Sequence, residues 1–209
     1  MEFDDKILVI GDSITRHYFP YTKDALIEHE IEAVIPEKWV SCQWKQLRAI
    51  GQLLQGKRCY GGRQVKAESV HFNFGLHSIK LPNKGHDPDH QRAEEVEFEI
   101  YEKELIEQIE KLRSLGIGTI LFSNTTPNPK NAGMRNDLDV VRLNEIAERV
   151  MKEYDIPHND LYGFVKAQED YPRLYKHPRS ENNCHFEEHG RKLLGENVAK
   201  FISDNLNNE

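Results

Sequence analysis

The chain has little cysteine and no long apolar run. Its three cysteines, Cys42, Cys59 and Cys184, stand at wide and unrelated spacings among 209 residues. This favours a reducing compartment over a disulfide framework. No apolar stretch approaches the roughly 20 residues of a membrane-spanning helix, and the initial MEFDDK lacks the features of a signal peptide. We therefore expect a cytoplasmic protein with no membrane partner.

The sequence also has fewer basic than acidic residues. The sequence has 28 Lys and Arg residues against 35 Asp and Glu residues, which gives a formal net charge of −7. A net negative chain is a poor partner for nucleic acid or an anionic membrane surface, so we expect neither. No internal repeat, linker or low-complexity segment divides the sequence. Its length fits one domain over residues 1–209 with a sizeable core.

Strand and helix patterns alternate along the chain. Short apolar, β-branched runs predict strands at 6–10, 31–35, 69–74, 117–123 and 156–162. Amphipathic spacing predicts helices at 20–30 and 44–54, a long charged helix around 98–112, a helix capped by Asn136 or Asp137, and a final helix at 187–206. Residues 166–183 are expected to be irregular. Such alternation indicates an α/β fold with a parallel sheet covered on both faces.

Three short stretches place reactive side chains where strands end. Gly11-Asp12-Ser13 follows the first strand, Gly75 and His77 follow the third, and His185 precedes the last helix. In a parallel sheet, active groups gather at the carboxyl ends of the strands. A serine needs a neighbouring base to attack, and His185 is the candidate base. Each stretch alone also fits a structural interpretation: an ordinary turn for the first, and a histidine bonded to nearby backbone for the second.

Taken together, the sequence resembles the SGNH hydrolase superfamily, the GDSL esterases and lipases. VIGDSIT is similar to the nucleophile block, NFGLHS lies where the family has its Gly-x-Asn block, and NNCHF lies where it has Asp-x-x-His. The resemblance implies a three-layer α/β/α sandwich, flavodoxin-like, with Ser13 as nucleophile and His185 as general base. It also implies an oxyanion hole formed by the amides of Ser13 and Cys42 and by the side chain of His77.

The chain departs from the family pattern at the supporting positions. His77 stands where the family has asparagine, Cys42 is the nearest equivalent of a glycine, and Asn182 stands where an aspartate orients the histidine. An amide can orient an imidazole but supplies no charge. Three explanations stay open: a slow Ser-His dyad, an acid supplied by Glu181 or Asp170, or an inactive variant.

Further residues are candidates for contacts with substrate. We predict substrate-binding roles for Asp12, Arg16, Gly75 and Asn124, although Arg16 could equally form a salt bridge on its helix. The segment GHDPDHQ, residues 85–91, offers histidines and aspartates, but nothing in its pattern fixes their spacing. We therefore predict no metal and no other cofactor.

The leading hypothesis is a serine esterase that removes a short acyl group, with acetyl as the expected group, from a polar and carbohydrate-like small molecule. The alternative is a catalytically impaired relative that uses the same cleft to bind a small molecule or carbohydrate, as Asn182 suggests. A third hypothesis is a flavodoxin-like domain that binds phosphate after the first strand, but it leaves His185 without a role.

Overall fold

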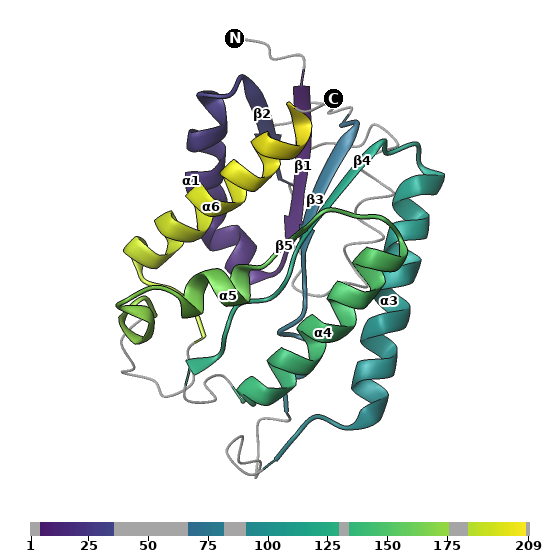
Figure 1. The fold of residues 1–209 in the computed structure, drawn as a ribbon, viewed down its shortest axis with the longest axis vertical. Helices are drawn as coiled ribbons and strands as arrows, with labels where there is room; N and C mark the ends of the chain where they lie inside the picture. Colours follow the sequence, from purple (N-terminus) through teal and green to yellow (C-terminus); the bar gives the residue numbers. More distant parts are fainter. Residues whose placement is uncertain (1–4, 36–66, 82–90, 130–133, 176–183, 208–209) are drawn as a thin grey trace.

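The computed structural model describes residues 5–35, 67–81, 91–129, 134–175 and 184–207. Its centre is a five-stranded, all-parallel sheet in the order β2-β1-β3-β4-β5 (Figure 1). The strands are β1 (Asp5–Gly11), β2 (Ile31–Val34), β3 (Ser69–Asn73), β4 (Thr119–Ser123) and β5 (His158–Asn159). The predicted α/β class with a parallel sheet is confirmed.

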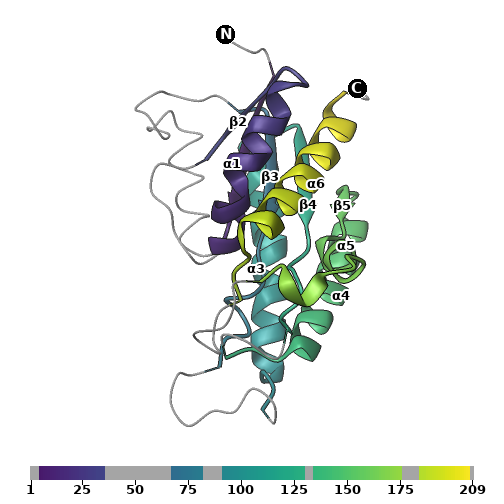
Figure 2. The same cartoon turned by 90° about the vertical axis from the view of Figure 1, so that its left-hand side faces the viewer.

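Helices cover both faces of this sheet. They are α1 (Ser13–Ile27), α3 (Glu95–Ser114), α4 (Asp137–Glu153), α5 (Leu161–Lys166) and α6 (Glu188–Leu206), with a 3₁₀ turn at Tyr171–Arg173. Helices α1 and α6 pack together on one face, and Figure 2, seen from their side, shows α3 behind the sheet. No helix in the described ranges is long and apolar enough to cross a bilayer.

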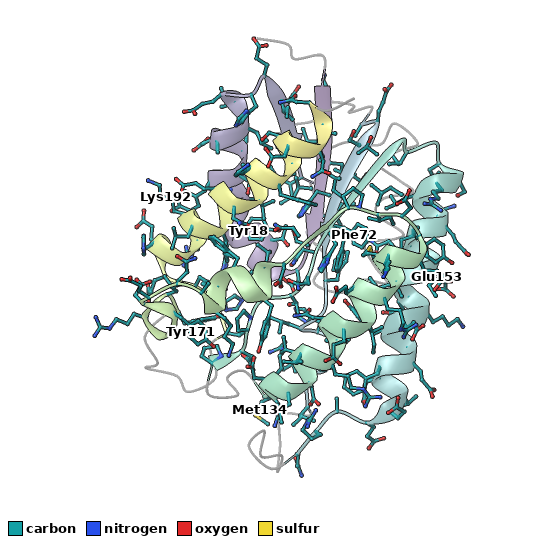
Figure 3. All side chains as sticks on the ribbon, viewed as in Figure 1. Tyr18, Phe72, Met134, Glu153, Tyr171 and Lys192 are labelled. Carbon is teal, nitrogen blue, oxygen red and sulfur yellow. The ribbon has the colours of Figure 1, made fainter. Side chains whose placement is uncertain are left out.

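The central strands β1, β3 and β4 are buried on both faces, which explains their mostly apolar sequence. Ile7, Leu8, Val9 and Ile10 of β1 are all almost fully inaccessible, as a central parallel strand between two helical layers requires. Figure 3 shows Tyr18 and Phe72 inside the molecule, whereas Lys192 lies on its outside. The apolar residues of the sheet and of the inward helix faces form one continuous core.

Helix α1 begins seven residues earlier than the sequence predicts. Its cap is Asp12, whose side-chain oxygen accepts a hydrogen bond from the Ile14 amide at 2.8 Å. Such a cap satisfies one of the amides that a helix start leaves without an acceptor. Pro20 lies inside the helix, where it removes one helical hydrogen bond. The proline suggested a helix start, but the Asp12 cap defines the actual one.

Other predicted elements lie close to their expected places. Asn136 caps α4, as predicted, by accepting a hydrogen bond from the Leu138 amide. The short helix α5 occupies the end of a segment predicted as strand, because Asp160 caps it after only two residues of β5. The helix predicted at 44–54 lies outside the described residues.

The order of the strands reverses at β1. The chain passes from β1 outward to β2 and then returns to β3 on the other side of β1, so β1 and β3 flank the switch point of the sheet. Gly11 at the end of β1 is in register with Asn73 at the end of β3. Open α/β sheets form their binding crevice at this position, beyond the carboxyl ends of the strands.

Helices α1 and α6 approach closely at Gly195. A Cβ atom on this residue would lie 2.5 Å from the Cβ of Tyr21 and 2.8 Å from the carbonyl oxygen of Tyr18. The Thr22 hydroxyl donates to the carbonyl of Gly195 at 3.2 Å. Since α1 starts at Ser13 and α6 starts three residues after His185, this contact couples two distant parts of the chain.

We predict that Gly195→Ala destabilises the fold by about 1–2 kcal/mol, because the clash with α1 outweighs the better helix propensity of alanine. Chemical denaturation measures this difference. Gly118→Ala is the matched control, since a Cβ there would have only the Glu68 carbonyl oxygen nearby, at 3.8 Å. The control should change stability by no more than about 0.5 kcal/mol. A stabilised Gly195→Ala protein would contradict the close helix contact.

Candidate active site

The turn after β1 is built for close packing. A Cβ atom on Gly11 would lie 1.9 Å from Oγ1 of Thr15 and 2.8 Å from the carbonyl oxygen of Asn73. Only glycine therefore lets β1 turn into α1 beside the end of β3. Ser13 follows as the first residue of α1, half-buried at the carboxyl edge of the sheet. Its backbone N–H belongs to the first turn of the helix, where amides have no intrahelical acceptor.

Ser13 and His185 meet at this edge. Nε2 of His185 lies 2.8 Å from Oγ of Ser13, although 172 positions separate the two residues in sequence. The hydroxyl can donate to Nε2 when the imidazole carries its proton on Nδ1. That arrangement is the one in which an imidazole can accept the proton of an attacking hydroxyl. The structure thus brings together the nucleophile and the base that the sequence predicts.

His185 is held by its two neighbours in sequence, which are both buried. Phe186 is almost inaccessible, forms a β-bridge with Tyr175 and packs against its ring at a centroid distance of 4.2 Å. Cys184 is buried on the other side of His185. Side chains alternate along an extended segment, so burying residues 184 and 186 turns His185 outward toward Ser13.

Cys184 itself does not act as the nucleophile in this arrangement. Burial is the largest cause of the raised pKa of its thiol, so the thiolate is disfavoured. Its sulfur lies 3.9 Å from Nη1 of Arg135. Cys184 is therefore a buried structural residue next to His185.

A buried carboxyl group immediately precedes the candidate nucleophile. Asp12 is only 2% exposed, and its Oδ2 has no hydrogen-bond partner among the described residues. Burial raises the pKa of Asp12, while the Ile14 amide and the charges of Arg135 and His185 oppose that rise. Asp12 caps the helix and lies too deep to contact a substrate freely. Its predicted substrate-binding role is untested, but its position suits an electrostatic role.

Arg135 is a buried cation beneath the same edge. It is 5% exposed, and its Nε donates to the carbonyl of Leu76 on the turn after β3. It interacts electrostatically with Asp12, Cys184 and His77. Arg135 thus links the loop before α4 to the segments that carry the candidate nucleophile, base and oxyanion donor.

His77 lies on the turn after β3, with its ring partly accessible. Its ring forms no hydrogen bond with another described residue, and a neutral imidazole offers one N–H donor. Desolvation is the largest cause of its lowered pKa, followed by the positive charges of Arg135 and Lys80. A neutral imidazole is therefore favoured at neutral pH. The predicted role of His77 in an oxyanion hole stays a prediction.

The other predicted contact residues fall into two groups. Arg16 is exposed on α1, one turn from the site. Gly75 and Asn124 are buried, and the Asn124 side chain is used within the protein: its Nδ2 donates to Asp160 at 2.7 Å and its Oδ1 accepts from the Tyr162 amide at 2.9 Å. These two bonds tie the end of β4 to α5, and they give Asn124 a structural function.

Several predicted residues lie outside the described ranges. They are Cys42, Glu181, Asn182 and the candidate metal ligands His86, Asp87, Asp89 and His90. Among the described residues, no cluster of three His, Cys, Asp or Glu side chains could hold a metal ion. Asp170, one of the two acids considered as an orienting group for His185, lies 3.9 Å from Nε2 of His189 instead.

A buried polar network beneath the site was not anticipated. Asn73 donates from Nδ2 to the carbonyls of Ser123 and Asn124, at 2.9 and 2.7 Å, and accepts from the Thr15 hydroxyl at 3.3 Å. It thereby joins β3, β4 and α1 below the Ser13 turn. The signal in the sequence is a polar residue within the apolar run SVHFNF, which a buried strand tolerates only with full hydrogen bonding.

No family model and no curated relative matches this sequence, whereas solved structures match it well. A lipase/acylhydrolase from Enterococcus faecalis is 16% identical with a TM-score of 0.67, and 96% of each chain is covered. An acetyl xylan esterase is 14% identical with a TM-score of 0.66, covering 96% of this chain and 99% of its own. A GDSL-like lipase from Bacteroides thetaiotaomicron is 14% identical with a TM-score of 0.63, covering 97% and 89%.

The chain therefore has the fold of the GDSL-type acylhydrolases. The resemblance to the SGNH hydrolase superfamily predicted from the sequence motifs is confirmed for the fold. At identities of 14–17% among the GDSL-type and acetyl xylan esterase structures, the likeness concerns the fold, and the chemistry must be argued from the residues of this chain.

The buried histidine His71 makes the stability of the fold depend on pH in a testable way. It is fully buried on β3, its Nε2 lies 2.7 Å from Oγ of Ser123, and burial lowers its pKa to about 3. The unfolded chain binds a proton at this histidine near pH 6.5, whereas the folded chain does not. Stability is therefore lost as the pH falls from about 6.5 toward 3.

We predict that His71→Gln removes this loss, which amounts to about 2 kcal/mol between pH 6.5 and 4.5. Urea denaturation of both proteins across that range measures the difference. His29→Gln, at an exposed position on the turn after α1, is the control and should keep the slope of the parent protein. An identical slope in the parent and in His71→Gln would show that His71 is not held neutral.

Proposed function

We propose that this protein is a serine ester hydrolase with Ser13 as nucleophile and His185 as general base. The observation that carries the proposal is the 2.8 Å contact between Ser13 Oγ and His185 Nε2 at the switch point of the sheet. Its fold, shared with acylhydrolases and an acetyl xylan esterase, supports the same chemistry.

The reaction proceeds in two halves. Ser13 attacks the ester carbonyl while His185 takes the hydroxyl proton on Nε2, and the bond from carbon to the leaving oxygen then breaks as His185 returns that proton to the alcohol. Water, deprotonated by the same imidazole, releases the acid and restores Ser13. The tetrahedral oxyanion is stabilised by the Ser13 amide at the helix start and by His77, with the Cys42 amide as the third proposed donor.

Buried charge compensates in part for Asn182. The imidazolium that forms on His185 needs a negative partner, and an asparagine at position 182 supplies none. In its ionised form Asp12 places a negative charge next to Ser13, and its electrostatic interaction with His185 is then attractive when the imidazole is protonated. Because the pKa of Asp12 is raised by burial, this compensation weakens as the pH falls. We therefore propose a working but slow Ser-His pair.

The substrate that fits the proposal is a small ester with a short acyl group on a polar alcohol. A structure with the same fold belongs to a protein described as an acetyl xylan esterase, which favours an acetyl group on a carbohydrate. Polar side chains around the edge, with His77 and Arg16 exposed, suit a hydroxyl-rich alcohol better than a lipid chain.

We predict that the protein hydrolyses p-nitrophenyl acetate and that Ser13→Ala lowers the rate by at least about a thousandfold. Ser78→Ala, on the turn after β3, is the control and should retain activity within a few-fold. Asn182→Asp, in the same assay, should raise kcat because it restores the charge that stabilises the imidazolium.

The outcomes of this assay distinguish an enzyme from a protein that uses the same cleft only to bind a ligand. If the parent and Asn182→Asp both match the buffer blank, the esterase proposal fails and a cleft used only for binding replaces it. If Ser13→Ala keeps the activity of the parent protein, the assignment of the nucleophile is wrong.

A further inference from the structure

Two exposed basic residues lie on the segments around the candidate nucleophile. Arg16 is on α1, three positions after Ser13, and residues three apart are neighbours on a helix surface. Lys80 is on the segment that follows β3, and the end of β3 is in register with the end of β1. The two basic residues therefore lie on the segments that leave the two strands at the switch point of the sheet.

Neither side chain is neutralised within the described part of the chain. Arg16 and Lys80 form no ion pair and no side-chain hydrogen bond with another described residue, so the salt bridge considered for Arg16 on its helix is not formed there. By contrast, Arg142 and Arg149 on α4 each pair with a glutamate of α3. An exposed cation that the described chain does not neutralise can attract an anion from solution and donate charge-assisted hydrogen bonds to it.

A buried cation adds to the positive charge of this edge. Arg135 is 5% exposed, and its Nε donates to the carbonyl of Leu76 on the turn after β3. Arg135 and Lys80 both interact electrostatically with His77. Both also interact with Cys184, which directly precedes the proposed base. The charge of Lys80 therefore reaches the turn after β3 and the segment before α6.

Acidic side chains are few at the same edge. The described residues 74–81, after β3, and 124–129, after β4, contain no acid. Asp12 is buried, and Glu187 and Glu188 lie at the start of α6. The chain as a whole has a formal net charge of −7 and would repel anions in general. The exposed cations at this edge are therefore a local exception to the charge of the protein.

We propose that Arg16 and Lys80 bind an anionic group on the alcohol of the substrate. This inference rests on the proposed function, in which the acyl group is short, so that a charge bound away from the ester carbonyl belongs to the alcohol. A carboxylate or a phosphate has the required charge and accepts hydrogen bonds from guanidinium and ammonium groups. The substrate class is therefore a short-chain ester of an acidic alcohol. The two cations determine specificity and take no part in bond cleavage.

The kinetic test compares two acetate esters, p-acetoxybenzoate and the neutral p-acetoxybenzamide. The ratio of their kcat/KM values, each corrected for the uncatalysed rate, should exceed about ten in the parent protein. Arg16→Gln and Lys80→Gln should each lower this ratio by about two- to fivefold, and the double variant by about tenfold, because each exposed cation contributes a modest attraction. Added salt should lower the ratio in the parent, since it screens exposed charges.

The matched control is Lys23→Gln, which removes an exposed lysine further along α1 and should keep the ratio of the parent protein. A ratio near one in the parent, or the same ratio in the parent and the double variant, would overturn the anion site.

An NMR titration tests the same site without any activity. The probes are p-hydroxybenzoate and phenyl phosphate, with neutral p-hydroxybenzamide as the reference. In the parent protein, both anions should shift the amide signals of Arg16, His77 and Lys80 and should bind at least about fivefold more tightly than the neutral amide. The tighter anion identifies a carboxylate or a phosphate as the group that is recognised. The double variant should lose this preference.

The two experiments distinguish failure of the anion site from failure of the esterase. Equal affinity for the neutral amide and for both anions would overturn the anion site, whether or not the protein hydrolyses esters. If neither ester is hydrolysed but the parent still prefers the anions and the double variant does not, the anion site is supported and the proposed reaction is wrong.

Discussion

The close packing of α1 against α6 is the constraint on which the site depends. Ser13 opens α1, and His185 lies three residues before α6, so the distance between their reactive atoms follows from how the two helices meet. Gly195 lets them approach, and the Thr22 hydroxyl bonds across the contact. Two residues that are 172 positions apart in sequence are thus brought close enough for a hydrogen bond of 2.8 Å between Ser13 Oγ and His185 Nε2.

Beneath this pair, the apolar sheet gives way to polar side chains that are buried and mostly hydrogen-bonded. Asn73 joins three elements, and His71 stays neutral against Ser123. Arg135 is the buried cation of this layer, and it interacts with the carboxyl group of Asp12, whose pKa is raised by burial. Buried charges are costly unless they compensate each other. Arg135 therefore provides a fixed positive charge beneath the edge of the sheet at which charge would develop in the proposed ester cleavage.

The sequence was informative wherever one local rule decided the structure. The apolar runs located the strands, Asn136 marked the start of α4, and Gly-Asp-Ser with a late histidine identified the two residues that meet. Pro20 was misleading, because a proline inside a helix resembles a helix start, whereas the Asp12 side chain defines the actual cap. Partnerships that depend on packing could not be predicted from local patterns. The contact of His17 with His185 and the burial of Arg135 arise only when α1, α6 and the loop before α4 come together.

The most direct test of the account is covalent labelling with a fluorophosphonate, followed by peptide mass spectrometry of the parent and of His185→Ala. The account predicts one adduct per chain, on Ser13, because its half-buried hydroxyl contacts an imidazole that can accept its proton, whereas the Ser123 hydroxyl beside His71 is fully buried. It also predicts that labelling slows by at least about tenfold in His185→Ala. An adduct on a different residue, or an unchanged rate without His185, would contradict the account.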